Sequence, residues 1–126
     1  MMRTSPTMMA LLAGAALALS GLVHAAEPAM EKDGMLVDSK GMTLYTYDKD
    51  AMGKSNCNDS CATNWPPLMA EAGAKADDDW TVVKRDDGTM QWAYYGKPLY
   101  TFIQDKKAGD MVGDGKGGVW HVAKPE

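Results

Sequence analysis

The sequence predicts a small, mainly β domain in which antiparallel strands form two pseudo-symmetric hairpin repeats, with one short helix near a pair of cysteines. Three observations lead to this prediction: a segment that occurs twice, short β-branched or alternating stretches between turn residues, and a polar, cysteine-containing segment after the first copy. The repeated segment reads GMTLYTY at residues 41–47 and GKPLYTF at residues 96–102, which are 55 residues apart.

The same offset relates aromatic and acidic residues within and beyond this segment. The related pairs are Tyr45 with Tyr100, Tyr47 with Phe102, Asp50 with Asp105, and Trp65 with Trp120. A period of this length indicates one supersecondary unit that is used twice. We therefore expect a single domain, residues 26–126, that contains repeats at about residues 34–68 and 89–123.

The N-terminal residues 1–25 have the pattern of a secretory signal peptide. Arg3 supplies the positive charge, residues 8–23 are apolar, and the best cleavage position follows Ala25. The apolar run is too short to remain as a membrane span, so we expect none after cleavage. The protein is therefore expected in the periplasm or outside the cell.

The charge of the mature chain excludes some classes of partner. Removing residues 1–25 leaves 12 of the 13 basic residues and all 17 acidic residues, a net charge of −5. An acidic surface argues against binding of nucleic acid or anionic lipid. The remaining partners are an unknown envelope protein or a small ligand.

The first repeat is expected to begin with a hairpin. Residues 35–37 and 43–48 form its strands, and Gly41 lies in the turn, where a positive backbone angle is needed. Turn- and cap-forming residues follow, which predicts a one- or two-turn helix over residues 55–62. The two cysteines would share a face of that helix.

The second repeat has clearer strand signals. Residues 80–84 and 90–95 are expected to form a hairpin around Asp87 and Gly88. Further strands are expected at residues 99–103 and 120–122, and irregular structure at residues 26–33, 71–79 and 106–118. An alternative arrangement has two hairpin units face to face without a continuous sheet.

Cys57 and Cys61 are expected to form a structural disulfide, because an exported pair is usually oxidised. The loop they close is short, so the bond contributes only about 2 kcal/mol and mainly shapes the loop. Thiol redox chemistry is the alternative function, but three residues separate the cysteines where thioredoxin-like motifs have two.

Copper binding is the alternative that would use the sulfur-containing residues as ligands. Its candidate ligands are Cys57, Cys61, Met52 and His121. The methionines of the mature chain are scattered, however, and His121 is its single histidine. No cofactor and no resident metal are therefore expected.

The repeated aromatic and acidic residues are expected to be structural. The six aromatic side chains of the repeat pairs would form the paired core of the two units. Asp50 and Asp105 would accept hydrogen bonds from backbone N–H groups of the loops that follow them. Motifs of hydrolases, phosphate-binding loops and zinc proteases are absent from the sequence, so we do not expect an enzyme.

These residues follow the pattern G-x-x-L-Y-T-(Y/F)-x-x-D twice, with C-x-x-x-C-A-x-x-W-P-P-L after the first copy. The pattern resembles the bacterial family described as a secreted repeat of unknown function, also described as predicted lipoproteins with a Y-x-(F/W/Y)-x-x-D motif. The matching positions are Tyr45, Tyr47, Asp50, Tyr100, Phe102, Asp105, Cys57, Cys61, Trp65, Pro66 and Pro67. The likeness covers residues 34–122.

The resemblance implies export but no particular activity. Many relatives resemble lipoproteins, whereas this chain has no cysteine near the cleavage position, so lipid anchoring is not expected. The function expected from the sequence is a soluble periplasmic, non-enzymatic module for binding or envelope support.

Overall fold

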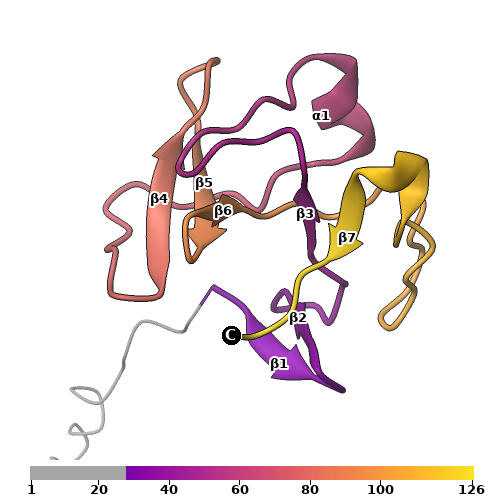
Figure 1. The fold of residues 1–126 in the computed structure, drawn as a ribbon. Helices are drawn as coiled ribbons and strands as arrows, with labels where there is room; N and C mark the ends of the chain where they lie inside the picture. Colours follow the sequence, from indigo (N-terminus) through magenta and orange to yellow (C-terminus); the bar gives the residue numbers. More distant parts are fainter. Residues whose placement is uncertain (1–27) are drawn as a thin grey trace, which may run out of the picture.

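Short strands account for most of the regular structure in residues 28–126, the part of the chain that this computed structural model describes (Figure 1). The strands are β1 (Met30–Lys32), β2 (Met35–Val37), β3 (Tyr45–Tyr47), β4 (Trp80–Lys84), β5 (Met90–Tyr94), β6 (Lys97–Pro98) and β7 (Trp120–Val122). A short helix, α1 (Ser60–Asn64), and a 3-10 turn, η3 (Lys116–Gly118), complete the elements. The predicted fold class is confirmed. The predicted signal peptide lies outside the described residues.

Each repeat begins with an antiparallel hairpin and a third strand. In the first repeat β1 pairs with β2, and β2 continues through an isolated bridge from Val37 to Thr43. In the second repeat β4, β5 and β6 form one three-stranded sheet. Gly41 lies in the turn between β2 and Thr43, and Gly88 lies in the turn between β4 and β5; their φ angles are 84° and 89°, which glycine adopts without strain.

The first strand of the first repeat was not expected. Residues 26–33 carry little periodicity, yet Met30–Lys32 pair in register with Met35–Val37. All three residues of β1 are exposed, so their side chains carry no hydrophobic pattern that would reveal the strand. The prediction of an irregular segment there was wrong because β1 forms by backbone pairing, which leaves no hydrophobic pattern in its three side chains.

The last segment of each repeat pairs with the other repeat. We call residues 64–70 and 119–125 the closing segments. In the second of these, β7 pairs with β3 of the first repeat, with Tyr45 opposite Val122 (Figure 1). In the first, Pro67 forms a bridge with Tyr100 of the second repeat.

This exchange changes two of the predicted strands. β3 is shorter than the predicted 43–48, and the predicted strand at 99–103 is reduced to the bridge at Tyr100. Pro66 and Pro67 have no N–H groups, so a regular ladder cannot form opposite residues 99–103. Thr101 N–H still donates to the Pro66 carbonyl at 2.8 Å.

Two rings of backbone hydrogen bonds hold the exchanged segments. In the first ring, Leu44 N–H donates to Leu36, Leu36 to Ala123, and Ala123 back to Leu44, at N···O distances of 2.8–3.1 Å. The second ring repeats this pattern with Leu99, Trp92 and Leu68. Each ring contains two strands of one repeat and the closing segment of the other.

The helix begins later than predicted. It was expected over residues 55–62, but α1 spans Ser60–Asn64, and Cys57 precedes it in an extended loop. Asn56 donates its N–H to the carboxylate of Asp50, which holds this part of the loop away from a helical path. The two cysteines therefore do not share a helix face.

Two clusters of buried side chains form the core. The aliphatic cluster contains Ala29, Leu36, Leu44, Trp80, Leu99 and Ala123, and the aromatic cluster contains Tyr45, Cys57, Trp65, Tyr100, Phe102, Trp120 and Val122. Both clusters draw residues from both repeats. No helix within residues 28–126 is long and apolar enough to cross a membrane.

The two hydrogen-bonded rings predict a cooperative domain. We expect the amide hydrogens of Leu36, Leu44 and Ala123 to exchange with solvent at the same free energy of opening as those of Leu68, Trp92 and Leu99. Opening either ring separates both repeats, so only global unfolding exposes these amides. Deuterium exchange followed by NMR measures this, with the amide of the exposed turn residue Gly73 as a fast control. Exchange of one ring through a much lower free energy would contradict it.

Candidate functional site

The repeated tyrosines and aspartates bond across the two repeats. Tyr45 of the first repeat donates its hydroxyl hydrogen to Asp105 of the second, with an O···O distance of 2.7 Å. Tyr100 of the second repeat donates in the same way to Asp50 of the first, at 2.6 Å. Between these bonds, Tyr45 and Tyr100 also exchange backbone N–H···O bonds at 2.8 and 3.0 Å. The motif thus joins the repeats at their pseudo-two-fold axis.

The second oxygen of each carboxylate holds the following loop. Asp50 accepts the N–H of Asn56 at 2.7 Å, and Asp105 accepts the N–H of Val112 at 2.9 Å. This is the role expected for these residues from the sequence. Each motif aspartate therefore connects the partner repeat's tyrosine to its own repeat's loop, which satisfies buried polar atoms in pairs.

The surroundings of these groups perturb their ionisation. Both tyrosine side chains are fully buried, and burial followed by the adjacent carboxylate raises the pKa of Tyr45 and Tyr100 far above 10. Burial also raises the pKa of Asp50, although the hydrogen bonds from Tyr100 and Asn56 oppose that shift. The phenols therefore stay neutral and act as donors throughout the physiological range.

The remaining repeat aromatics form one column of stacked rings. Trp65 and Trp120 lie in the middle, with ring centroids 3.8 Å apart and planes 4° apart. Phe102 stacks on Trp65 at 3.9 Å, and Tyr47 stacks on Trp120 at 4.2 Å. The rings thus alternate between repeats, and the column is close to symmetric about the tryptophan pair.

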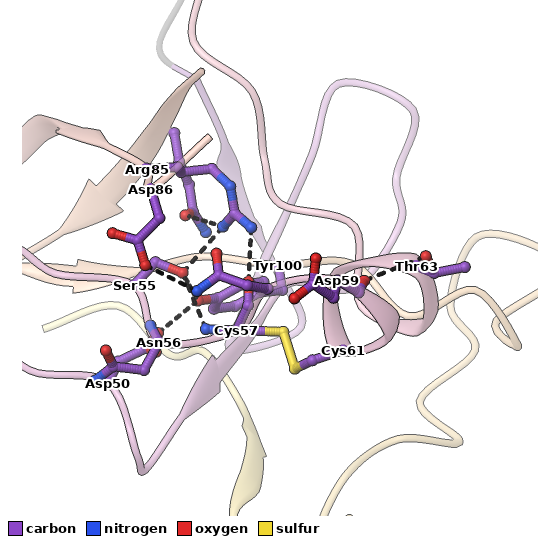
Figure 2. The surroundings of a disulfide bond; sticks show 12 residues. Asp50, Ser55, Asn56, Cys57, Asp59, Cys61, Thr63, Arg85, Asp86 and Tyr100 are labelled. Atoms are coloured by element: carbon purple, nitrogen blue, oxygen red, sulfur yellow. Dashed lines mark hydrogen bonds between the residues drawn. A yellow bond between two sulfur atoms is a disulfide. The ribbon is translucent and has the colours of Figure 1, made fainter. Parts of the chain in front are cut away.

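Cys57 and Cys61 form the predicted disulfide, with Cα atoms 5.2 Å apart (Figure 2). Cys57 is fully buried in the aromatic cluster, whereas Cys61 in α1 is partly exposed. Both sulfur atoms are bonded to each other, so neither thiolate is available in this form.

Arg85 was not predicted and anchors the loop that carries the disulfide. Its guanidinium is buried and donates to the Ser55 hydroxyl at 2.9 Å, the Gln91 side-chain oxygen at 2.8 Å and the Cys57 carbonyl at 2.6 Å (Figure 2). The Ser55 hydroxyl also bonds the Tyr100 hydroxyl at 2.7 Å. Arg85 therefore links the second repeat's hairpin to the loop of the first.

The other two candidate copper ligands lie elsewhere on the surface. His121 in β7 bonds through Nε2 to Asp48 at 2.8 Å, and Met52 is 74% exposed. Within residues 28–126 there is no group of three or more His, Cys, Asp or Glu side chains placed to hold a metal ion. Use of Cys57 and Cys61 as ligands would first require reduction of the disulfide.

Two adjoining cavities open beside β3, β6 and β7. The larger has a volume of about 480 Å³ and the smaller about 190 Å³, and Thr46, Asp48 and Lys97 line both. Further lining residues of the larger cavity include Tyr94, His121 and Lys124. Because its walls come from the first repeat's strand and the second repeat's closing segment, the cavity depends on the exchange of closing segments.

The internal repeat gives each cavity residue a counterpart on the other side of the molecule. Four of the lining residues have uncharged counterparts 55 positions away: Asp48 and Ile103, Lys97 and Met42, His121 and Pro66, and Lys124 and Met69. Glu126 of the lining corresponds to Glu71 and keeps its charge. The backbone is equivalent at both places, since Asp48 donates to Val119 at 2.8 Å and Ile103 donates to Asn64 at 3.0 Å. The two lysines are therefore found on one side only.

Comparison with known proteins adds the family to this description. The family model described as a secreted repeat of unknown function matches residues 28–69 and 81–124, which together exceed half of the chain. The chain belongs to this family. No curated protein and no solved structure matches the chain. The family membership confirms the resemblance seen in the sequence and supports export of this secreted-repeat protein.

Of the residues that line the larger cavity of the secreted-repeat protein, His121 alone was a candidate site residue from the sequence. Asp48, Lys97 and Lys124 differ from their counterparts, so the residues that the two repeats share do not reveal them. A difference between the repeats is the signal that could have revealed these residues. It occurs where equivalent positions carry a charged residue in one repeat and an apolar residue in the other. Arg85 had no such signal, because its bonding depends on the loop from the other repeat.

We expect Tyr45→Phe and Tyr100→Phe each to lower the free energy of unfolding by about 1–3 kcal/mol, because each leaves a carboxylate oxygen inside the fold without its donor. Tyr94→Phe is the matched control, since the Tyr94 hydroxyl only accepts an exposed N–H from Glu126. Its effect should stay within about 0.5 kcal/mol. Urea denaturation of the three variants measures these differences, and equal effects for all three would refute the structural role of the crossed bonds.

The raised tyrosine pKa values predict loss of stability in alkali. Above the ordinary tyrosine pKa of 10, the unfolded chain ionises at Tyr45 and Tyr100 while the folded chain does not. Stability is therefore present below pH 10 and falls above it by about 1.4 kcal/mol per pH unit for each tyrosine. Denaturation between pH 9 and 11.5 should show a shallower slope for the Tyr45→Phe, Tyr100→Phe double variant. An unchanged slope would rule out the two tyrosines as its source.

Proposed function

We propose that the secreted-repeat protein is a non-enzymatic binding module of the bacterial envelope that works as a soluble protein in the periplasm. The observation that carries this proposal is the internal use of the family motif. The hydroxyl groups of the two motif tyrosines donate to the two motif aspartates, Tyr45 to Asp105 and Tyr100 to Asp50. Each aspartate also accepts a backbone N–H from the loop that follows it. The motif thereby builds a scaffold, and it leaves recognition to the surface that the scaffold presents.

The cavity beside β3, β6 and β7 is the surface feature best suited to recognition. Its volume of about 480 Å³ falls within the range of about 300–1,000 Å³ common to small-molecule sites. Its lining offers hydroxyl, ammonium, imidazole and carboxylate groups that could orient a polar ligand. The proposed partner is therefore a small polar molecule of the envelope.

Copper binding or thiol redox exchange through Cys57 and Cys61 is the competing function. It receives less support from the structure, because the disulfide joins both sulfurs and Cys57 is fully buried. Electrons from a dithiol would have to enter through the partly exposed sulfur of Cys61.

A screen of pooled small polar metabolites by two-dimensional NMR tests the binding function. We expect saturable shifts confined to amides around the cavity, such as those of Thr46, Lys97 and His121. Absence of any such compound would overturn the small-ligand proposal.

The competing function has two tests. Successful competition of the reduced protein with a chelator for Cu(I) would favour copper binding. Rapid equilibration of the disulfide with a mild dithiol would favour redox exchange.

A further inference from the structure

Lys97 and Lys124 both line the larger cavity, and neither has a carboxylate partner within residues 28–126. Within residues 28–126 the ion pairs are Lys54 with Asp86, Lys107 with Asp110, and His121 with Asp48. Neither lysine of the cavity takes part in any of them. Lys97 also lines the smaller cavity, so it stands where the two cavities meet.

Two of the acidic residues that line the cavities already have hydrogen-bond partners within the protein. Asp48 bonds to His121 at 2.8 Å, and both oxygens of Asp50 accept hydrogen bonds from Tyr100 and Asn56. Glu126 is the remaining acidic residue in the lining of the larger cavity, and it lies at the outer end of the chain segment that borders it. With His121 neutral, the formal charges of Lys97 and Lys124 cancel those of Asp48 and Glu126 in the larger cavity, whereas the whole protein has a formal net charge of −4.

The internal repeat provides a reference for this concentration of charge. Lys97 and Lys124 correspond to Met42 and Met69, which occupy the same positions in the other repeat. Met69 is 51% exposed, so the fold itself does not require a charged residue there for solvation. Since the backbone framework is the same on both sides, the two lysines are not needed to build the fold.

We propose that the larger cavity binds a small organic anion whose carboxylate or phosphate group is held between the ammonium groups of Lys97 and Lys124. This inference rests on the proposed binding function and names the class of its ligand. The hydroxyl groups of Thr46 and Tyr94 lie in the same lining and can donate to, or accept from, the rest of the molecule. The acidic surface elsewhere on the protein repels such an anion, which favours the cavity over other basic residues.

The test is an NMR titration of protein purified from the periplasm after export, with inorganic phosphate and with succinate as separate probes at constant ionic strength. Constant ionic strength is required because salt screens exposed charges. We expect saturable shifts of the Thr46 and His121 amides with at least one probe. Saturation by phosphate alone identifies a phosphate ligand, and saturation by succinate alone identifies a carboxylate ligand.

Charge-removing variants assign the effect to the cavity. Lys97→Gln and Lys124→Gln should each weaken binding at least fivefold, and the double variant should abolish it. Lys75→Gln is the matched control, because Lys75 is exposed in the segment between the repeats and its removal changes the net charge equally. The double variant's amide spectrum outside the cavity reports that it remains folded.

Three results would overturn the inference, and the first two are no saturable shift with either anion, and equal weakening by Lys75→Gln, which would indicate a general charge effect. A neutral compound that binds the cavity with unchanged affinity in Lys97→Gln and Lys124→Gln would also overturn it. In that last case the proposed binding function would stand, so the two failures are distinguishable.

Discussion

The exchange of closing segments between the repeats is the constraint on which the rest of the structure depends. Neither repeat can complete its own three-stranded ring, because the third member comes from the other repeat. The crossed Tyr45–Asp105 and Tyr100–Asp50 bonds then align the two repeats at the centre. A chain of this length can bury only a small core. Because the closing segments are exchanged, both repeats contribute side chains to each buried cluster, and the core is not divided between them.

The two repeats secure equivalent loops by different means. The first loop is held by the disulfide and by Arg85, which reaches it from the second repeat's hairpin. The second loop has no cysteine and relies on close approach: a Cβ at Gly113 would lie 2.6 Å from the Trp65 ring. One loop is thus tied covalently, and the other is fitted against the stacked rings. Both leave the central column in the same geometry.

Much of this architecture could be predicted from the sequence, because the repeats contain residue types that strongly favour strands, turns or a disulfide. The β-branched residues of β4, the alternating residues of β5 and the Asp87-Gly88 turn predict the hairpin with nearly the correct bounds. The disulfide followed from export and from the absence of other cysteines. Local pattern and local chemistry were sufficient in these places.

The parts that could not be predicted depend on contacts distant in sequence. Nothing local to Tyr45 indicates that its strand pairs with β7, or that its hydroxyl bonds to Asp105. β1 has no buried face, and Arg85 finds its acceptors only after the loop from the other repeat is in place. The charged cavity likewise exists only where Lys97 and Lys124 meet a strand of the first repeat.

When closing segments are exchanged in reciprocal pairs, as they are here, they also impose a rule of parity on proteins assembled from this unit. A chain with an even number of copies can complete every ring within itself. With an odd number, one unit lacks a neighbour to donate its final strand and one terminal strand has no acceptor. Such a chain must find the missing half in another molecule or leave an edge open to aggregation. Copy number and assembly are therefore linked by the backbone bonds themselves.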